Sequence, residues 1–379
     1  MSKKSTKDVL TSPFLMTVYA IILMIVFLFF KFKTNEGIII NSFEEKNESS
    51  WSCNYDFFSG EKKVSLKGKG NNLFVCPIVE QGKIDVEVKD KSGKILFNQT
   101  VHGGLANYAE LEVFNIKVPS EVIVTIKSKR HKGGISVNYR DLDEFSKESK
   151  EVMFLYGETH DYEGIKKVEA DLWGKYYKEY GMRNLFMEYS YIDAQFLNMW
   201  MKSEDDKILN QLYDDFEGTF AHTEENLNFY KEIKEKYPET IFYGTDICHT
   251  YETAGKRYLK YLEENGKVGT DDYNRAVESV NQGKKYYNYK STEKDGIHRK
   301  YREKAMVKNF VNEYEKLEDK RIMGVYGTPH VLPYSNYVDE VTRMGVQLDK
   351  KYRKILNVED LCTLEKYPKY KESEYRYYK

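Results

Sequence analysis

The fold of the second half of this chain follows from the stretch VMFLYGETH at residues 152–160. Its first five residues are apolar without alternation, which is typical of a strand buried on both faces of a parallel sheet. Three more short apolar runs follow at residues 183–187, 240–243 and 321–326, and helical stretches separate them. Because strand and helix alternate, the sequence predicts parallel βαβ units. We therefore expect an α/β domain with a mostly parallel sheet and added helices at residues 148–363.

Ionisable side chains follow each of the four apolar runs. Ligands of open parallel sheets bind beyond the carboxyl ends of the strands, so these side chains are expected at one edge of the sheet. A single acidic residue after a strand is most often a helix N-cap, but four such coincidences favour a functional site. In chain order the residues are Glu158, His160, Glu188, Asp246 and His330.

Acid–base chemistry is the first interpretation of this set. Glu158 and His160 are two residues apart, so in an extended segment both side chains point to the same side. A carboxylate beside an imidazole fixes its tautomer and raises its basicity, and His330 could serve as a second acid or base. No metal is assigned, yet the same residues Glu158, His160, Glu188 and His330 could instead hold a divalent metal ion. The sequence leaves both interpretations open. It contains no GxSxG elbow and no GxxxxGK[ST] loop, which disfavours a serine hydrolase and excludes a P-loop nucleotide hydrolase.

A helix predicted around residues 301–310 adds substrate-binding candidates. Arg302, Met306 and Asn309 are spaced four and three residues apart, so they share one helix face. We interpret this face as a wall of the pocket, where Arg302 and Asn309 bind substrate together with Asp246. Arg302 would offer its guanidinium fork to a carboxylate or an oxyanion. The alternative is an ordinary surface ion pair of Arg302, and His249 is left open between site and scaffold.

The N-terminal segment predicts a membrane anchor. Residues 9–30 carry no charge, and a helix of that length rises about 33 Å, enough to cross a bilayer. Three lysines precede this run, which favours a cytoplasmic N-terminus and an uncleaved signal anchor within residues 1–33. The expected localisation is therefore the cell membrane, single-pass, with an extracytoplasmic body. Residues 34–50 are expected to form a polar stalk.

Residues 51–142 predict a β-sandwich domain. Their apolar residues alternate with polar ones in short runs, and glycine-containing turn signals such as Lys132-Gly133-Gly134 separate the runs. If this domain lies outside the cytoplasm, Cys53 and Cys76 can form a disulfide; the alternative is two unrelated buried thiols. The four cysteines form no CxxC pair, so a thiolate zinc site is poorly supported. Residues 364–379 are aperiodic and are expected to form a flexible tail.

Composition limits the possible partners. The chain has 379 residues with 59 Lys and Arg against 60 Asp and Glu, a net charge of −1. No excess of cations is available to neutralise phosphates, so nucleic-acid binding is not expected. Hydrophobic residues make up 41%, which is enough for a substantial core.

Together the motifs resemble the erythromycin-esterase-like/ChaN-like superfamily, with TraB and Tiki proteins as distant relatives. The resemblance rests on Glu158-Thr159-His160, Glu188, Gly244-x-Asp246, Arg302-x-x-x-Met306-x-x-Asn309 and Gly327-x-x-His330, and it covers about residues 150–360. It implies an α/β core with its site at the strand ends. In the esterase branch, histidine and glutamate activate water without a metal; the Tiki branch is a metal-dependent peptidase and the ChaN branch binds haem. The last motif departs from the esterase pattern, so macrolides are not implied as substrates.

The expected function is a membrane-anchored extracytoplasmic hydrolase of an ester, amide or peptide bond. Its roles would be His160 as general base, Glu158 as its orienting partner, Glu188 as second carboxylate, His330 as acid or oxyanion partner, and Arg302 as substrate clamp. Two alternatives remain at this point. One is a protein that binds haem or another cofactor, and the other is a non-catalytic surface interaction protein that works through its β-domain.

Overall fold

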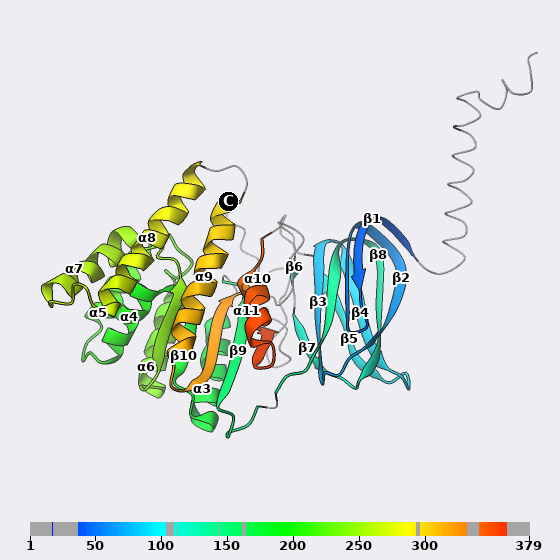
Figure 1. Ribbon diagram of the computed structural model, residues 1–379, viewed down its shortest axis with the longest axis horizontal. Helices are drawn as coiled ribbons and strands as arrows, with labels where there is room; N and C mark the ends of the chain where they lie inside the picture. Colours follow the sequence, from blue (N-terminus) through cyan, green and yellow to red (C-terminus); the bar gives the residue numbers. More distant parts are fainter. Residues whose placement is uncertain are drawn as a thin grey trace, which may run out of the picture. The chain divides into compact units, whose positions relative to one another are not determined.

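The computed structural model of the chain describes residue 17 and residues 37–103, 110–111, 113–143, 145–160, 164–292, 296–331 and 341–361. The chain divides into two compact units (Figure 1). Unit 1 comprises Met1–Leu111 and Ile116–Tyr139, and unit 2 comprises Glu112–Asn115 and Arg140–Lys379. The described part of unit 1 is built from strands, whereas unit 2 carries a second sheet with helices.

Hydrogen bonds join the strands of the first unit into one eight-stranded sheet. Its main path runs β1-β2-β8-β3-β6, β4 pairs with both β5 and β8, and β7 pairs with β3. The pairs β1–β2, β2–β8, β3–β6, β4–β5 and β4–β8 are antiparallel. The strands are β1 Ile38–Lys46, β2 Ser50–Lys67, β3 Asn72–Gln81, β4 Lys83–Asp90, β5 Ile95–His102, β6 Glu110–Leu111, β7 Phe114–Lys117 and β8 Glu121–Arg140.

This single sheet corrects the predicted β-sandwich domain. The strands β2 and β8 are 18 and 20 residues long, and β8 pairs with both β2 and β4, which joins these strands in one sheet. Gly133 and Gly134 are not a turn but lie inside β8, opposite Tyr55 and Asn54. Gly133 has a φ of 140°, and a Cβ there would collide with the carbonyl oxygen of Ile78. Gly133 lets β3 approach β8 closely, and Gly134 lies against Asn54 and the Cys53 carbonyl of β2. The sequence analysis interpreted these two glycines as a turn.

The predicted disulfide between Cys53 and Cys76 is also wrong, because Cys53 is a free, buried thiol. Cys53 lies on β2 and Cys76 on β3, and β8 lies between these two strands in the sheet. Two strands that have a third strand between them lie about 9–10 Å apart, which is too far for a disulfide bond. Within the expected stalk at residues 34–50, Ile38–Lys46 instead form strand β1, paired with β2.

The predicted single-pass membrane topology is corrected as well. Within the described ranges, no helix has both the length and the apolar character needed to cross a membrane. Apart from Thr17, the stretch 9–30 lies outside those ranges, as does the expected tail at 364–379. The anchor and the cell-membrane localisation therefore have no part in the function proposed below.

The second unit contains the expected parallel sheet with helices. Its five strands run in the order β11-β10-β12-β9-β13, and all neighbouring pairs are parallel. They are β9 Glu151–Glu158, β10 Asn184–Ser190, β11 Ile241–Asp246, β12 Lys320–Gly327 and β13 Leu356–Asp360. The four predicted apolar runs are thus strands β9, β10, β11 and β12, and β13 is an additional edge strand.

Helices connect these strands. In chain order they are α3 Ile165–Tyr180, α4 Tyr191–Met201, α5 Lys207–Asp215, α6 Glu224–Lys236, the π-helix η1 Tyr251–Gly255, α7 Lys256–Glu264, α8 Asp271–Thr292, α9 Ile297–Glu315, α10 Thr328–Val331 and α11 Met344–Tyr352. Several begin with a cap visible in the sequence. Ser190 and Asp193 form a capping box at α4, and the Thr223 hydroxyl accepts a hydrogen bond from the Asn226 amide at α6.

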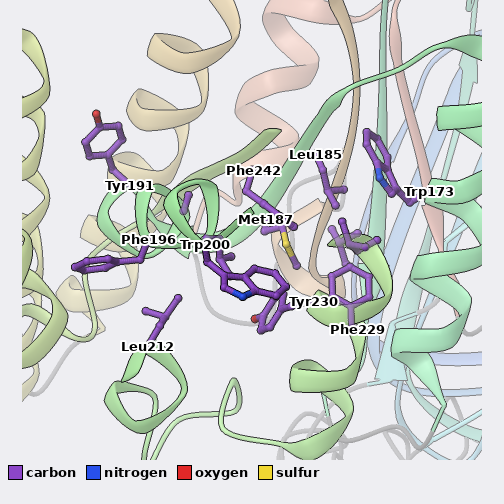
Figure 2. Packing of buried hydrophobic residues seen from close by; sticks show 14 of the residues in the cluster. Trp173, Leu185, Met187, Tyr191, Phe196, Trp200, Leu212, Phe229, Tyr230 and Phe242 are labelled. Atoms are coloured by element: carbon purple, nitrogen blue, oxygen red, sulfur yellow. The ribbon is translucent and has the colours of Figure 1, made fainter. Parts of the chain in front are cut away.

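Apolar residues of the helices pack on both faces of the parallel sheet, which explains why its strands are unbroken apolar runs in the sequence. On β10, Leu185 and Met187 join a cluster with Trp173 of α3 and Trp200 of α4, and Figure 2 shows these side chains together. Phe186, between them in sequence, points the other way and lies 5.1 Å, ring centre to ring centre, from Phe310 of α9. With apolar neighbours on both faces, the middle positions of the strand, Leu185, Phe186 and Met187, are all apolar and buried.

Candidate active site

The carboxyl ends of four strands meet at one edge of the parallel sheet. Glu158 at the end of β9 pairs in register with Gly327 at the end of β12, and Ser190 of β10 pairs with Asp246 of β11. The sheet order therefore places the predicted site residues side by side. The structure brings together Glu158, His160, Glu188, Asp246, Arg302 and His330 through direct contacts.

Glu158 and His160 form a carboxylate–imidazole pair, as their spacing predicted. The Nδ1 atom of His160 lies 3.0 Å from Oε1 of Glu158, so the carboxylate accepts the Nδ1 proton. The Nε2 atom is then the basic nitrogen, and it lies 4.0 Å from Oε1 of Glu188. Burial lowers the pKa of His160, but the hydrogen bond and charge of Glu158, together with Glu188, raise it above its usual value. His160 is thus an imidazole of increased basicity.

Two residues that the sequence did not single out hold Glu158 in place. The ammonium group of Lys166 on α3 lies 2.6 Å from Oε2 of Glu158 and 2.9 Å from Oε1 of Glu169. Burial raises the pKa of Glu158, yet the Lys166 charge holds it well below the usual range. Burial and the neighbouring Glu158 charge raise the pKa of Glu169 well above its usual value. A lysine three residues before a glutamate on a helix is typical of an exposed ion pair. The sequence therefore gave no local indication that Lys166 and Glu169 support the site.

His330 has its own carboxylate partner, Glu303, which the sequence analysis missed. The Nδ1 atom of His330 donates to Oε1 of Glu303 over 2.8 Å, and its Nε2 lies 3.4 Å from Oε1 of Glu188. The Met344 amide donates to the other Glu303 oxygen over 2.7 Å. Glu303 is buried and shares its helix face with the buried Met306 and Phe310. The sequence did contain a signal for Glu303, namely an acidic residue at a helix position that the spacing assigns to the apolar face.

Glu188 and Asp246 are bound together by Arg302. The Nε atom of Arg302 lies 3.0 and 3.1 Å from the two carboxylate oxygens of Asp246, and its Nη2 contacts both Asp246 and Glu188. Burial raises the pKa of Glu188, but the charges of His330 and Arg302 hold it below its usual value. Arg302 is therefore occupied by protein carboxylates, which makes it a support for Glu188.

The other two predicted substrate-binding residues lie behind the site. Asp246 is buried and also lies 3.3 Å from Nε2 of His249. The side-chain amide of Asn309 donates to the Thr245 carbonyl over 3.1 Å and exchanges hydrogen bonds with Gln282. These residues fix the end of β11, and they support the acid–base residues from behind.

Gly327 completes the floor of the site. Its amide donates a 2.5 Å hydrogen bond to Oε2 of Glu188. A Cβ at this position would lie 3.2 Å from Nε2 of His160 and 3.3 Å from Oε2 of Glu188. Glycine therefore keeps the space between His160 and Glu188 open, on the side where the basic nitrogen faces.

The alternative metal set needs Glu158, His160, Glu188 and His330 to converge on one ion. Among the residues that the structure describes, no group of three or more His, Cys, Asp or Glu side chains is placed to hold a metal. Their contacts give the reason. Lys166 occupies one oxygen of Glu158, and Arg302 and the Gly327 amide occupy the two oxygens of Glu188.

Comparison with known proteins adds a limited result. No protein-family model matches the chain. No curated protein matches it. Among solved structures, it is similar to a protein from Bacillus cereus, with 15% identity, 55% of this chain and 65% of that chain covered, and a TM-score of 0.39. A succinoglycan biosynthesis protein follows with 12% identity, 55% and 65% coverage and a TM-score of 0.40. A mutant of the erythromycin esterase EreC in its open conformation has 13% identity, with 55% of this chain and 69% of that chain covered and a TM-score of 0.40.

One of these three structures is an erythromycin esterase, the protein that names one branch of the resemblance given in the sequence analysis. The chain covers 65% of the first two proteins, less than two thirds of their length. At these identities and TM-scores the likeness carries no argument about activity or substrate.

Proposed function

We propose that this protein is a hydrolase that opens an ester, amide or peptide bond at the strand ends of its parallel sheet. One observation carries the proposal: two imidazoles, each held by its own carboxylate, direct Nε2 toward the same oxygen of Glu188. His160 does so at 4.0 Å and His330 at 3.4 Å. A base and an acid on either side of a fixed carboxylate is an arrangement that suits attack of water on a carbonyl.

The proposed reaction begins with a water molecule beside Oε1 of Glu188, which accepts a hydrogen bond from this water with its second lone pair. His160 Nε2 takes a proton from this water, while Glu158 accepts the Nδ1 hydrogen bond and stabilises the imidazolium that forms. The water oxygen bonds to the carbonyl carbon, and the carbonyl electron pair moves to its oxygen. When this pair returns, the bond to the leaving oxygen or nitrogen breaks. The protonated His330 donates its Nε2 proton to that leaving atom, and Glu303 holds the ring in place.

A substrate screen with purified protein tests this function. Aryl and alkyl esters, anilides and peptides are incubated with the protein, with and without a chelator, and the best substrate is used for the variants. His160→Ala is expected to lose about 10²–10⁴-fold in kcat, the usual contribution of a positioned general base. The matched control is His102→Ala, which changes an exposed histidine on β5. Equal rates for wild type and His160→Ala would contradict the proposal. Loss of activity in chelator would instead favour the metal-dependent alternative.

A further inference from the structure

One exposed aromatic ring lies directly against the candidate base. The side chain of Phe220 is 57% exposed, although a phenyl ring in water is unfavourable. Its ring centre lies 5.2 Å from that of the His160 imidazole, with 23° between the two planes. Single exposed apolar residues are common and need no explanation by themselves. Phe220 differs because its ring is stacked on a residue of the site.

The loop that carries Phe220 is held by several contacts. Phe216, four residues earlier, is buried and stacks on Tyr189 of β10 with ring centres 5.5 Å apart. On the other side, the Asn226 side-chain amide donates to the Phe220 carbonyl over 3.3 Å and to the Thr223 hydroxyl over 2.9 Å. The ring of Phe220 is therefore kept out of the core and beside His160 by contacts at both ends of its loop.

The direction of the proposed reaction indicates which part of a substrate would lie next to the Phe220 ring. The leaving group departs toward His330, because that imidazole supplies its proton. His160 stands at the other end, next to the attacking water. A group bonded to the reacting carbonyl on the acyl side thus points toward His160 and the ring that covers it. Glu188 and the Gly327 amide offer polar groups on the floor of the site, whereas Phe220 offers an apolar ring that stacks on the base.

We propose that Phe220 determines specificity by stacking on an aromatic or alicyclic ring in the acyl group of the substrate. This inference rests on the proposed hydrolase function and narrows it to esters or amides of ring-bearing carboxylic acids. Stacked or edge-on ring pairs contribute roughly a factor of ten in binding. Phe220 would act on binding, and the proton transfers would remain those of His160 and His330.

The kinetic test compares acetate and phenylacetate esters of the same alcohol, so that only the acyl group changes. Phe220→Ala should raise KM for the phenylacetate about tenfold with little change in kcat, and leave acetate hydrolysis within about twofold. Phe220→Tyr should retain the preference for phenylacetate. The control is Ile241→Ala, another exposed apolar residue, which begins β11 at the opposite end of the sheet. An equal loss for both esters with an altered pH profile would make Phe220 a positioning residue for His160 and overturn the inference.

A binding test separates this inference from the function on which it rests. Benzyl methyl sulfone and dimethyl sulfone are neutral and cannot be hydrolysed, and ligand-observed NMR measures their affinities. Wild type should bind the benzyl compound about tenfold more tightly, and Phe220→Ala should lose that difference. If no ester is hydrolysed but this difference is present, the function fails and the ring-binding role stands. If esters are hydrolysed but Phe220→Ala changes neither KM nor sulfone binding, the inference fails and the function stands.

Discussion

At the scale of single residues, the site is defined by which charged groups are already neutralised. Lys166 holds Glu158 ionised, and Glu158 in turn makes His160 more basic. Arg302 does the same for Glu188, which faces both imidazoles. The cations lie behind the carboxylates, and the imidazole Nε2 atoms lie in front. This order leaves the histidines as the groups that exchange protons with a substrate.

The pairing of Glu158 with His160 predicts a specific pH dependence. A general base must be neutral, so kcat/KM should rise as the pH rises through the pKa of His160. Because Glu158 raises that pKa above 6.5, the acid limb should lie above pH 6.5 in the wild type. Glu158→Gln removes the charge, which lowers the pKa of His160 and moves the acid limb to lower pH, with kcat reduced about tenfold or more.

The matched variant for this measurement is Glu303→Gln, which removes the carboxylate from His330 instead. It should reduce activity but leave the acid limb in its wild-type position, since the partner of His160 is intact. The pH profiles of kcat/KM for the three proteins decide between these outcomes. An unmoved acid limb in Glu158→Gln would show that His160 is not the base.

At the scale of elements, the long strand β8 depends on a glycine. Gly133 combines a φ of 140° with contact to the Ile78 carbonyl of β3. Gly133→Ala adds a collision to an unfavourable dihedral angle, and we expect it to lower the free energy of unfolding of unit 1 by about 3 kcal/mol or more. Gly93→Ala is the control. Gly93 has a φ of 86° with nothing within 4 Å, so the loss there should be about 1–2 kcal/mol.

Denaturant unfolding of both glycine variants measures this difference. Similar losses for the two would mean that β3 can move away from β8 without cost. A larger loss for Gly133→Ala would establish that the close approach of these strands is required for the continuous sheet.

At the scale of the whole molecule, we expect unit 1 to lose stability in acid because of one buried histidine. His131 on β8 is fully buried, and its burial lowers its pKa from 6.5 to about 4. Between these values the unfolded chain binds a proton that the folded unit 1 does not, so stability falls as the pH decreases from about 6.5 to about 4. The loss should reach about 3 kcal/mol at pH 4.

Thermal unfolding at several pH values tests this prediction. The transition of unit 1 should shift to lower temperature between pH 7 and pH 4, and His131→Gln should remove much of the shift. Glutamine keeps an acceptor for the Tyr55 hydroxyl, which lies 2.8 Å from Nδ1 of His131, but cannot become charged in this range. An unchanged pH dependence in His131→Gln would assign the acid sensitivity to other groups.

Local sequence determined those features whose physical cause lies within a few residues. The apolar runs at residues 183–187 and 321–326 became strands of the parallel sheet, because unbroken apolar runs need cover on both faces. The contact between Glu158 and His160 followed from their spacing of two along an extended segment. The alternation in residues 51–142 predicted strands, but it could not show that the glycines at 133 and 134 continue a strand.

Tertiary structure alone decided the partners that are distant in sequence. The last predicted strand, β12, lies between β10 and β9, and this order brings His330 to Glu188. Glu303 meets His330 across 27 residues, and Arg302 meets Asp246 across 56. Ion pairs of this kind depend on which helix covers which strand end. A side chain's type and spacing show that it can make such a contact, but only the packing of helices on the sheet determines with which residue it does so.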